Sequence, residues 1–157
     1  MRSLVVVLVA VVLWGCATNL PVPPPPPTGP VPDLVGTWRG TWGGEPVSLL
    51  ITDQLAVGYS GVYLGTWQLG GPQRPGIAGV LTTTIRGSAV SSRAEGWLGN
   101  DARGRLVLLV QTETPDGAQR LTLARVADDR FQGSGESSFR WGPRGPAELM
   151  RAAGPRP

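Results

Sequence analysis

Short runs of alternating apolar and polar residues fill the chain from Leu34 onward, and glycine, proline and aspartate separate these runs. Period-2 alternation is typical of strands with one buried face, and many short runs with turn residues between them favour a sandwich or barrel. The only stretch with even weak helical periodicity is Ala147 to Arg151. We therefore predict an all-β domain with strands near 34–42, 46–53, 57–68, 77–86, 88–98, 104–114, 119–127 and 130–141.

Residue parity divides each run into an apolar and a polar face. In the first run Leu34, Trp38 and Trp42 share one side, whereas Arg39 is on the other. The same parity predicts further inward positions at Val47, Leu49, Ile51, Tyr59, Tyr63, Trp67, Ile77, Leu81, Ile85, Phe131, Phe139 and Trp141. Strands of this kind favour a small antiparallel up-and-down β-barrel of about eight strands, which leaves no exposed sheet edge. Glycines between the inward aromatic residues let such a barrel bend and leave room for large rings.

The predicted connections are short, with turn signals at Gly43-Gly44, Arg86-Gly87, Pro115-Asp116-Gly117 and Asp128-Asp129, a turn at 53–56 and a longer loop at 69–76. If strand direction alternates from the first strand, the loops 69–76 and 99–104 lie at the end of the barrel away from the N-terminal segment. Binding residues tend to lie on loops carried by a rigid scaffold. We therefore expect a ligand or partner at a distal rim formed by Gln73, Arg74, Asn100, Asp101 and Arg103.

The N-terminus has the features of an export signal. Arg2 supplies a positive charge, and Leu4 to Trp14 is an unbroken apolar run of eleven residues, shorter than the ~20 needed for a transmembrane helix. The residues Leu13-Trp14-Gly15-Cys16 resemble the lipobox of bacterial lipoproteins. This resemblance implies cleavage after Gly15 and a thioether-linked diacylglyceryl group on Cys16, and Ala17 in place of aspartate implies the outer membrane. The alternatives are a plain secretory signal and a short helix with a chance cysteine.

A proline-rich segment follows, with eight prolines in residues 21–32. Such a run adopts extended polyproline II at ~3.1 Å per residue, so it could hold a domain roughly 50 Å from a membrane. The alternative is a ligand for a proline-reading groove. The predicted organisation is a signal peptide over 1–15, a lipidated cysteine and spacer over 16–32, a β-barrel domain over 33–151 and a flexible tail over 152–157.

The triplet Gly36-Thr37-Trp38, at the start of the first predicted strand, resembles the G-x-W signature of lipocalins. That family has eight up-and-down strands around a pocket for small hydrophobic molecules, so the resemblance implies a ligand-binding barrel. The candidate ligand contacts are Trp38, Trp42, Tyr59, Tyr63 and Trp67. These aromatic residues could line a cavity for an apolar ligand, stack against cell-wall sugars, or simply fill the barrel.

The composition excludes most catalytic and metal chemistry. The chain has no histidine and a single cysteine, and all fourteen basic residues are arginine, which excludes Ser-His-Asp and Cys-His catalysis, lysine-assisted serine catalysis and most zinc sites. The only adjacent pair of carboxylates, Asp128-Asp129, falls at an expected turn. We therefore expect no enzyme activity, no cofactor and no metal. After removal of Arg2 with the signal, thirteen arginines face eleven carboxylates, a balance that does not suit nucleic-acid binding.

Together these patterns predict a cell-envelope lipoprotein, held to the membrane by a lipid anchor, that displays a small β-barrel as a binding or structural module. Its partner would be a small apolar ligand or an envelope protein. Two alternatives remain at this point: a module that binds carbohydrate or protein, and a small integral outer-membrane barrel with charged residues in its lumen.

Overall fold

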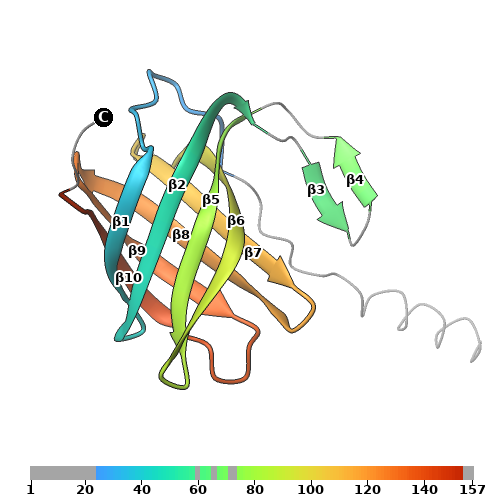
Figure 1. Ribbon diagram of the computed structural model, residues 1–157. Helices are drawn as coiled ribbons and strands as arrows, with labels where there is room; N and C mark the ends of the chain where they lie inside the picture. The colour runs from blue at the N-terminus through green and yellow to red at the C-terminus, as the bar shows by residue number, and fades with distance from the viewer. Residues whose placement is uncertain (1–23, 59–60, 65–66, 71–73, 154–157) are drawn as a thin grey trace, which may run out of the picture.

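The computed structural model describes residues 24–58, 61–64, 67–70 and 74–153. Eight antiparallel strands close into a barrel in the order β1-β10-β9-β8-β7-β6-β5-β2 (Figure 1), which confirms the predicted all-β up-and-down architecture. A separate two-stranded sheet, β3–β4, lies between β2 and β5 in the chain. The strands are β1 (Gly36–Trp42), β2 (Glu45–Gly58), β3 (Gly61–Leu64), β4 (Trp67–Gly70), β5 (Arg74–Ile85), β6 (Ser88–Asn100), β7 (Leu106–Thr114), β8 (Gly117–Ala127), β9 (Arg130–Ser137) and β10 (Gly145–Arg151).

The prediction of a third barrel strand at 57–68 is wrong. β2 continues through the predicted turn at 53–56 and stays paired with β5 as far as Gly58. Two register irregularities, which begin at Ile51 and at Leu55, accommodate the polar residues that had suggested a turn, because a bulge inserts residues without ending a strand. The chain then leaves the barrel, and β3 and β4 pair with each other as an antiparallel hairpin.

The end of the chain also differs from the prediction. β9 ends at Ser137, and the eighth barrel strand is β10, within the segment that had weak helical periodicity. Ala147 and Leu149 are buried, whereas Met150 is 49% exposed, which is the alternation of a strand. β10 pairs with both β9 and β1. Because β1 would otherwise be an open edge, this tertiary pairing outweighs the local helix preference of the segment.

One continuous apolar core fills the interior of the barrel. The predicted parity of β1 is confirmed, since Trp38 is 1% and Trp42 0% exposed and Arg39 points to the exposed face. The Trp38 ring meets Phe131 of β9 edge-on, at 5.0 Å between ring centroids. The core residues are Leu34, Trp38, Trp42, Val47, Leu49, Ile51, Ile77, Leu81, Ala94, Leu98, Leu108, Val110, Leu121, Leu123, Phe131, Ala147 and Leu149.

Glycine is required where barrel strands or large rings approach the backbone. A Cβ atom on Gly40 would overlap the backbone carbonyl of Glu148 on β10. A Cβ atom on Gly135 would lie 2.6 Å from the Trp42 ring. These contacts agree with the prediction that glycines between the inward aromatic residues permit tight coiling and leave room for the rings.

The barrel has two distinct ends, with the first at the top of Figure 1 and the second at the bottom. We call them the spacer end and the far end. The spacer end carries residues 24–35, the connections to β3–β4, loop 101–105 and the turn Asp128-Asp129. The far end carries the turns Gly43-Gly44, Arg86-Gly87 and Pro115-Asp116 and the loop 138–144. Positive φ angles at Arg86 (55°) and Gly87 (77°) identify the tight type of hairpin turn that the sequence predicted.

Candidate functional site

Residues 31–35 close the spacer end of the barrel. Leu34 is 1% exposed, and Val31 packs against the same core. Gln54 of β2 holds the segment in place, because its Oε1 accepts a hydrogen bond from the Leu34 amide at 2.7 Å and its Nε2 donates to the Pro32 carbonyl at 2.9 Å. This part of the chain is therefore a component of the barrel.

Arg151, the last residue of β10, fastens the same segment. Its guanidinium donates to the carbonyl oxygens of Asp33 at 2.9 Å and Val35 at 2.8 Å, and it lies 5.2 Å from the centre of the Trp38 ring. Trp38 Nε1 donates to the Leu34 carbonyl at 2.9 Å. Hydrogen bonds from a charged donor are stronger than neutral ones. Arg151 thus joins the C-terminal strand of the barrel domain firmly to its N-terminal segment.

The proline-rich segment is also docked farther upstream. The Asn100 amide at the end of β6 donates to the Pro25 carbonyl at 2.9 Å, and the Asn100 side chain is hydrogen-bonded to the Thr28 hydroxyl at 2.8 Å. Gly99 permits this approach, since a Cβ atom there would lie 2.5 Å from the Pro25 carbonyl oxygen. The expectation of a free stand-off of roughly 50 Å is therefore wrong, because the segment contacts the barrel from Pro24 onward.

The predicted distal rim is placed at the wrong end. Arg74 begins β5, and Asn100, Asp101 and Arg103 lie at the end of β6 and in the following loop, all at the spacer end. Gln73 lies outside the described residues. The error follows from the missed continuation of β2, because one strand too many before residue 77 reverses the direction assigned to every later strand. A role of these residues in binding remains a prediction.

Asp101 organises the loop between β6 and β7. Its Oδ1 accepts hydrogen bonds from the amides of Arg103 and Arg105, both at 2.9 Å, and its Oδ2 accepts one from Arg105 Nε at 2.8 Å. The Arg105 amide, followed by the Arg105 side chain and the Arg103 amide, lowers the pKa of Asp101 below its ordinary value of 3.8. Donors that stabilise the charged form act in this direction.

This geometry predicts a pH response that is local to the loop. Because the pKa is lowered in the folded state, the carboxylate stabilises the loop above pH 3.8 and loses that contribution as the pH falls through the lowered value. We expect an NMR titration of the Asp101 carboxyl carbon to have its midpoint below 3.8. Arg105→Gln, which keeps the backbone donors, should raise the midpoint only part of the way. A midpoint at or above 3.8 in the parent chain would contradict this assignment.

The candidate aromatic residues that the structure describes are divided between the barrel and the β3–β4 hairpin. Trp38 and Trp42 are core residues of β1. Tyr63 and Trp67 belong to β3 and β4, which are not part of the barrel sheet. Tyr59 lies outside the described residues. The expectation that these residues share one barrel face is therefore wrong for the hairpin residues, and a ligand-binding role for any of the five remains a prediction.

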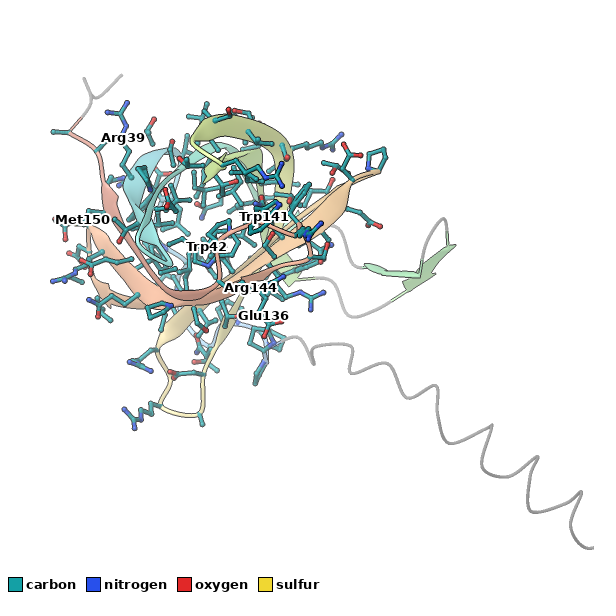
Figure 2. The ribbon with its side chains drawn as sticks, turned by 90° about the horizontal axis from the view of Figure 1, so that it is seen from below. Arg39, Trp42, Glu136, Trp141, Arg144 and Met150 are labelled. Carbon is teal, nitrogen blue, oxygen red and sulfur yellow. The ribbon has the colours of Figure 1, made fainter. Side chains whose placement is uncertain are left out.

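The loop 138–144 crosses the far end of the barrel. Trp141 of this loop lies 4.9 Å from the guanidinium carbon of Arg86 and 5.2 Å from that of Arg140, measured to the ring centre. Arg86 belongs to the β5–β6 turn, four strands away from the β9–β10 loop around an eight-stranded barrel, and thus on the opposite side. Figure 2 views the barrel from this end and shows Trp141 within the ring of strands.

Trp141 is nevertheless 54% exposed, the largest exposed fraction among the large hydrophobic side chains in the described part of the chain. Parity had predicted an inward position on a strand, and this was wrong because β9 ends at Ser137. The Arg144 Nε donates to the Ser137 carbonyl at 3.0 Å, and the Ser138 hydroxyl accepts a hydrogen bond from the Ala118 amide at 2.8 Å. These bonds hold the loop against β8 and β9, so Trp141 is presented on a fixed support.

A polar layer lies inside the barrel near this end. Gln119 Nε2 donates to Thr83 Oγ1 at 2.9 Å, and Thr112 Oγ1 donates to Gln119 Oε1 at 3.5 Å. All three side chains are at most 2% exposed, and Ser137 is 4% exposed. Trp42 Nε1 is buried without a hydrogen-bond partner among the described residues. Parity could have located this layer, since Gln119 falls on the inward side of β8 with Leu121 and Leu123.

The remaining titratable pairs have structural contacts on the surface. Arg93 and Glu95 form an ion pair at 3.1 Å, with 75% of the Arg93 side chain exposed. Asp128 lies in the β8–β9 turn, as predicted, and pairs with Arg125 at 2.8 Å. Within residues 24–153, excluding the undescribed gaps, no three histidine, cysteine, aspartate or glutamate residues are arranged to hold a metal ion. In the same part of the chain, no helix has the length and apolar character needed to cross a bilayer.

Comparison with known proteins adds no family assignment. No protein-family model, no curated protein and no solved structure matches this chain.

Proposed function

We propose that this protein is a lipid-anchored component of a bacterial cell envelope, and that it uses the far end of its barrel to bind a protein or carbohydrate partner. The anchor is Cys16, within the lipobox-like residues 13–16. The observation that carries the binding proposal is Trp141, which lies across the barrel end opposite the spacer.

Several features of the far end support a binding surface. Tryptophan and arginine are the residue types most enriched among the energetically dominant contacts of protein interfaces. Here Trp141 is exposed and is flanked by Arg86 and Arg140, whose guanidinium groups lie near its ring. The ring is held by a loop with its own hydrogen bonds, so little conformational freedom is lost when a partner binds. An exposed aromatic ring also provides a platform on which a sugar ring can stack.

The burial pattern favours a binding surface at the far end over an internal site for an apolar ligand and over a transmembrane barrel. Trp38 and Trp42 pack among core residues. Their rings therefore contact other core side chains, where an internal ligand site would have them contact an apolar ligand. The outside of the barrel carries charged residues, including Arg39, Arg93 and Glu148, whereas its interior is mostly apolar, with an uncharged polar layer around Gln119. A transmembrane barrel has the reverse arrangement, with an apolar outer band and a polar lumen.

Cys16→Ser tests the lipid anchor. The thiol is the only one in the chain, so we expect the variant to lose the diacylglyceryl group entirely, to leave the membrane fraction or to accumulate as an uncleaved precursor. Mass spectrometry of the N-terminal peptide of the parent protein should find the lipid on Cys16. A mature, membrane-bound Cys16→Ser protein would show that the anchor lies elsewhere.

Site-specific photo-crosslinking tests the binding surface. A photoreactive residue at Arg140, beside Trp141, should form adducts in intact cells, and Trp141→Ala should abolish them. A photoreactive residue at Arg103 in the spacer-end loop is the matched control, and Met150→Ala is the control for loss of an exposed apolar side chain. Adducts that form equally at position 103, or that persist in Trp141→Ala, would refute the proposal.

A further inference from the structure

β7 is buried on both of its faces, although only one face of a barrel strand points into the core. Leu108 and Val110 point inward and are 0% exposed. Val107 and Leu109 have the opposite parity and are not among the core residues, yet they are only 6% and 5% exposed. Because successive side chains of a strand point to opposite faces, the outer face of β7 is covered as well.

The neighbouring strand β6 extends this covered area. Gly99 pairs with Val107, and Trp97 pairs with Leu109. Directly opposite residues of an antiparallel pair are neighbours on the same face, so these four residues form an apolar strip on the outside of the barrel, which we call the outer strip. Gly99 is itself buried, and Trp97 is partly buried. The strip is short, since Glu95 precedes it on the same face of β6 and Asp101 begins the loop that follows β6.

The proline-rich segment, drawn in blue in Figure 1, lies on the spacer-end part of the outer strip. A Cβ atom on Gly99 would lie 2.5 Å from the Pro25 carbonyl oxygen and 2.7 Å from the Pro24 ring. Gly99 is not among the glycines with a positive φ angle, so its backbone conformation does not require glycine. What this position requires is the close approach of the proline segment to the strand.

Hydrogen bonds complement this apolar contact. The Asn100 amide donates to the Pro25 carbonyl at 2.9 Å, and the Asn100 side chain is hydrogen-bonded to the Thr28 hydroxyl at 2.8 Å. Proline has no amide hydrogen, so a proline segment brings carbonyl acceptors to the barrel without donors that need partners. An apolar strip with a tryptophan, next to hydrogen-bond donors, is the kind of surface on which proline-rich segments dock.

We infer that the outer strip and Asn100 form a binding site for a proline-rich peptide in the polyproline II conformation, and that residues 24–28 of this chain occupy it. The four consecutive prolines from Pro24 to Pro27 have fixed φ angles, and each proline keeps the preceding residue out of the α region. The segment is therefore extended before it docks and loses little conformational entropy when it does. The proline run thus acts as a ligand of its own barrel.

This site lies outside the far end, so it does not depend on the proposed binding surface around Trp141. It has one consequence that rests on the proposed lipid anchor. Pro24 is eight residues downstream of Cys16, and eight residues span at most about 28 Å. In an anchored chain, a docked segment would therefore keep the barrel closer to the membrane than a free spacer would.

Amide hydrogen exchange at Asn100 measures the docking in the full chain, since an amide bonded to the Pro25 carbonyl exchanges when the segment lifts off. The variant Pro24→Ser/Pro25→Ser keeps the length of the segment and removes both rings. Gly99→Ala places a Cβ atom against the Pro25 carbonyl. Each variant should accelerate exchange at Asn100 about tenfold, which corresponds to about 1.4 kcal/mol.

Two controls accompany these variants. Pro30→Ser makes the same substitution at an exposed position of the segment, and it should leave exchange at Asn100 unchanged. The amide of Leu108, on a strand that is paired on both sides, should stay protected in every variant, which shows that the barrel remains folded.

A synthetic peptide with the sequence of residues 24–30 tests recognition of a separate molecule. Added to the Pro24→Ser/Pro25→Ser chain, it should restore the protection of the Asn100 amide and shift the amide resonances of Gly99 and Leu109. The same peptide with serine in place of its first two prolines should do neither. The Gly99→Ala chain should respond to neither peptide.

Three results would overturn the proposal. Unchanged exchange at Asn100 in Pro24→Ser/Pro25→Ser would show that the proline rings contribute nothing to docking. A proline peptide without effect at about millimolar concentration, the effective concentration that a short linker provides, would show that the contact follows from chain connectivity alone. Equal effects of the proline and serine peptides would show that the site binds an extended backbone and does not recognise proline.

Discussion

Trp38→Ala is expected to lower the free energy of unfolding by about 3–5 kcal/mol, the range for truncation of a buried large aromatic side chain. Trp38 is 1% exposed and packs edge-on against Phe131 at 5.0 Å. Its removal leaves a cavity in the core and deprives the Leu34 carbonyl of the hydrogen bond from Nε1. It also removes the ring beside the Arg151 guanidinium. Urea unfolding of residues 17–157, followed by far-ultraviolet circular dichroism, measures the loss.

Two variants separate the contributions to this effect. Trp141→Ala removes the same side chain from an exposed position, and it should change stability by no more than about 0.5 kcal/mol. Trp38→Phe keeps an aromatic ring and removes the Nε1 donor, so its cost should fall between the two. A Trp38→Ala protein that unfolds at the same urea concentration as the parent would contradict the inward placement of Trp38.

Gly40→Ala is expected to cost about 3 kcal/mol, at the upper end of the usual range for overpacking. A Cβ atom at this position would overlap the backbone carbonyl of Glu148 and would lie 3.1 Å from the Leu149 Cα. A backbone carbonyl cannot rotate away as a flexible side chain can, so β1 and β10 would have to move apart. That movement would open the seam between the first and last strands of the barrel, where Gly40 pairs with Leu149.

Gly29→Ala is the matched control for this substitution. Gly29 has nothing within 4 Å of an added Cβ atom, so its replacement should be neutral within about 0.5 kcal/mol. Thermal unfolding of both variants gives the comparison. If the two variants melt together, the contact between Gly40 and β10 imposes no constraint on side-chain size.

The errors in strand assignment show where the local sequence pattern fails to predict the strand boundaries. Asp53 and Gln54 have the polar character of a turn, but β2 runs through them, because pairing with β5 continues on both sides of a register irregularity. Gln54 instead binds the segment before β1. A residue 20 positions earlier in the chain thus gives this glutamine its role. No local window of sequence contains that information.

In the candidate site, too, some positions follow from local alternation and others depend on tertiary contacts. The inward position of Trp42 follows from alternation within a single strand and was predicted. Trp141 has the same apparent parity with Phe131, but Gly142 and Pro143 follow it and the strand has already ended. Its position over the far end depends on Arg86, which lies in a turn on the opposite side of the barrel. Contacts across a closed barrel cannot be read from residue spacing.

The sequence by itself determined the all-β class, most of the tight hairpin turns and the apolar face of β1. These properties depend on alternation and turn residues that are neighbours in the chain. The predicted number of eight barrel strands agrees with the structure only because the wrong strand at 57–68 offsets the missed strand β10. The tertiary structure alone decided that β10 closes the barrel, that β3–β4 leaves it, and that the proline-rich segment returns to it. Each of these outcomes depends on hydrogen bonds between distant residues, such as the one from Arg151 to Val35 across 116 positions. The physical reason is that a barrel must pair its last free edge, and the whole chain decides which segment does so.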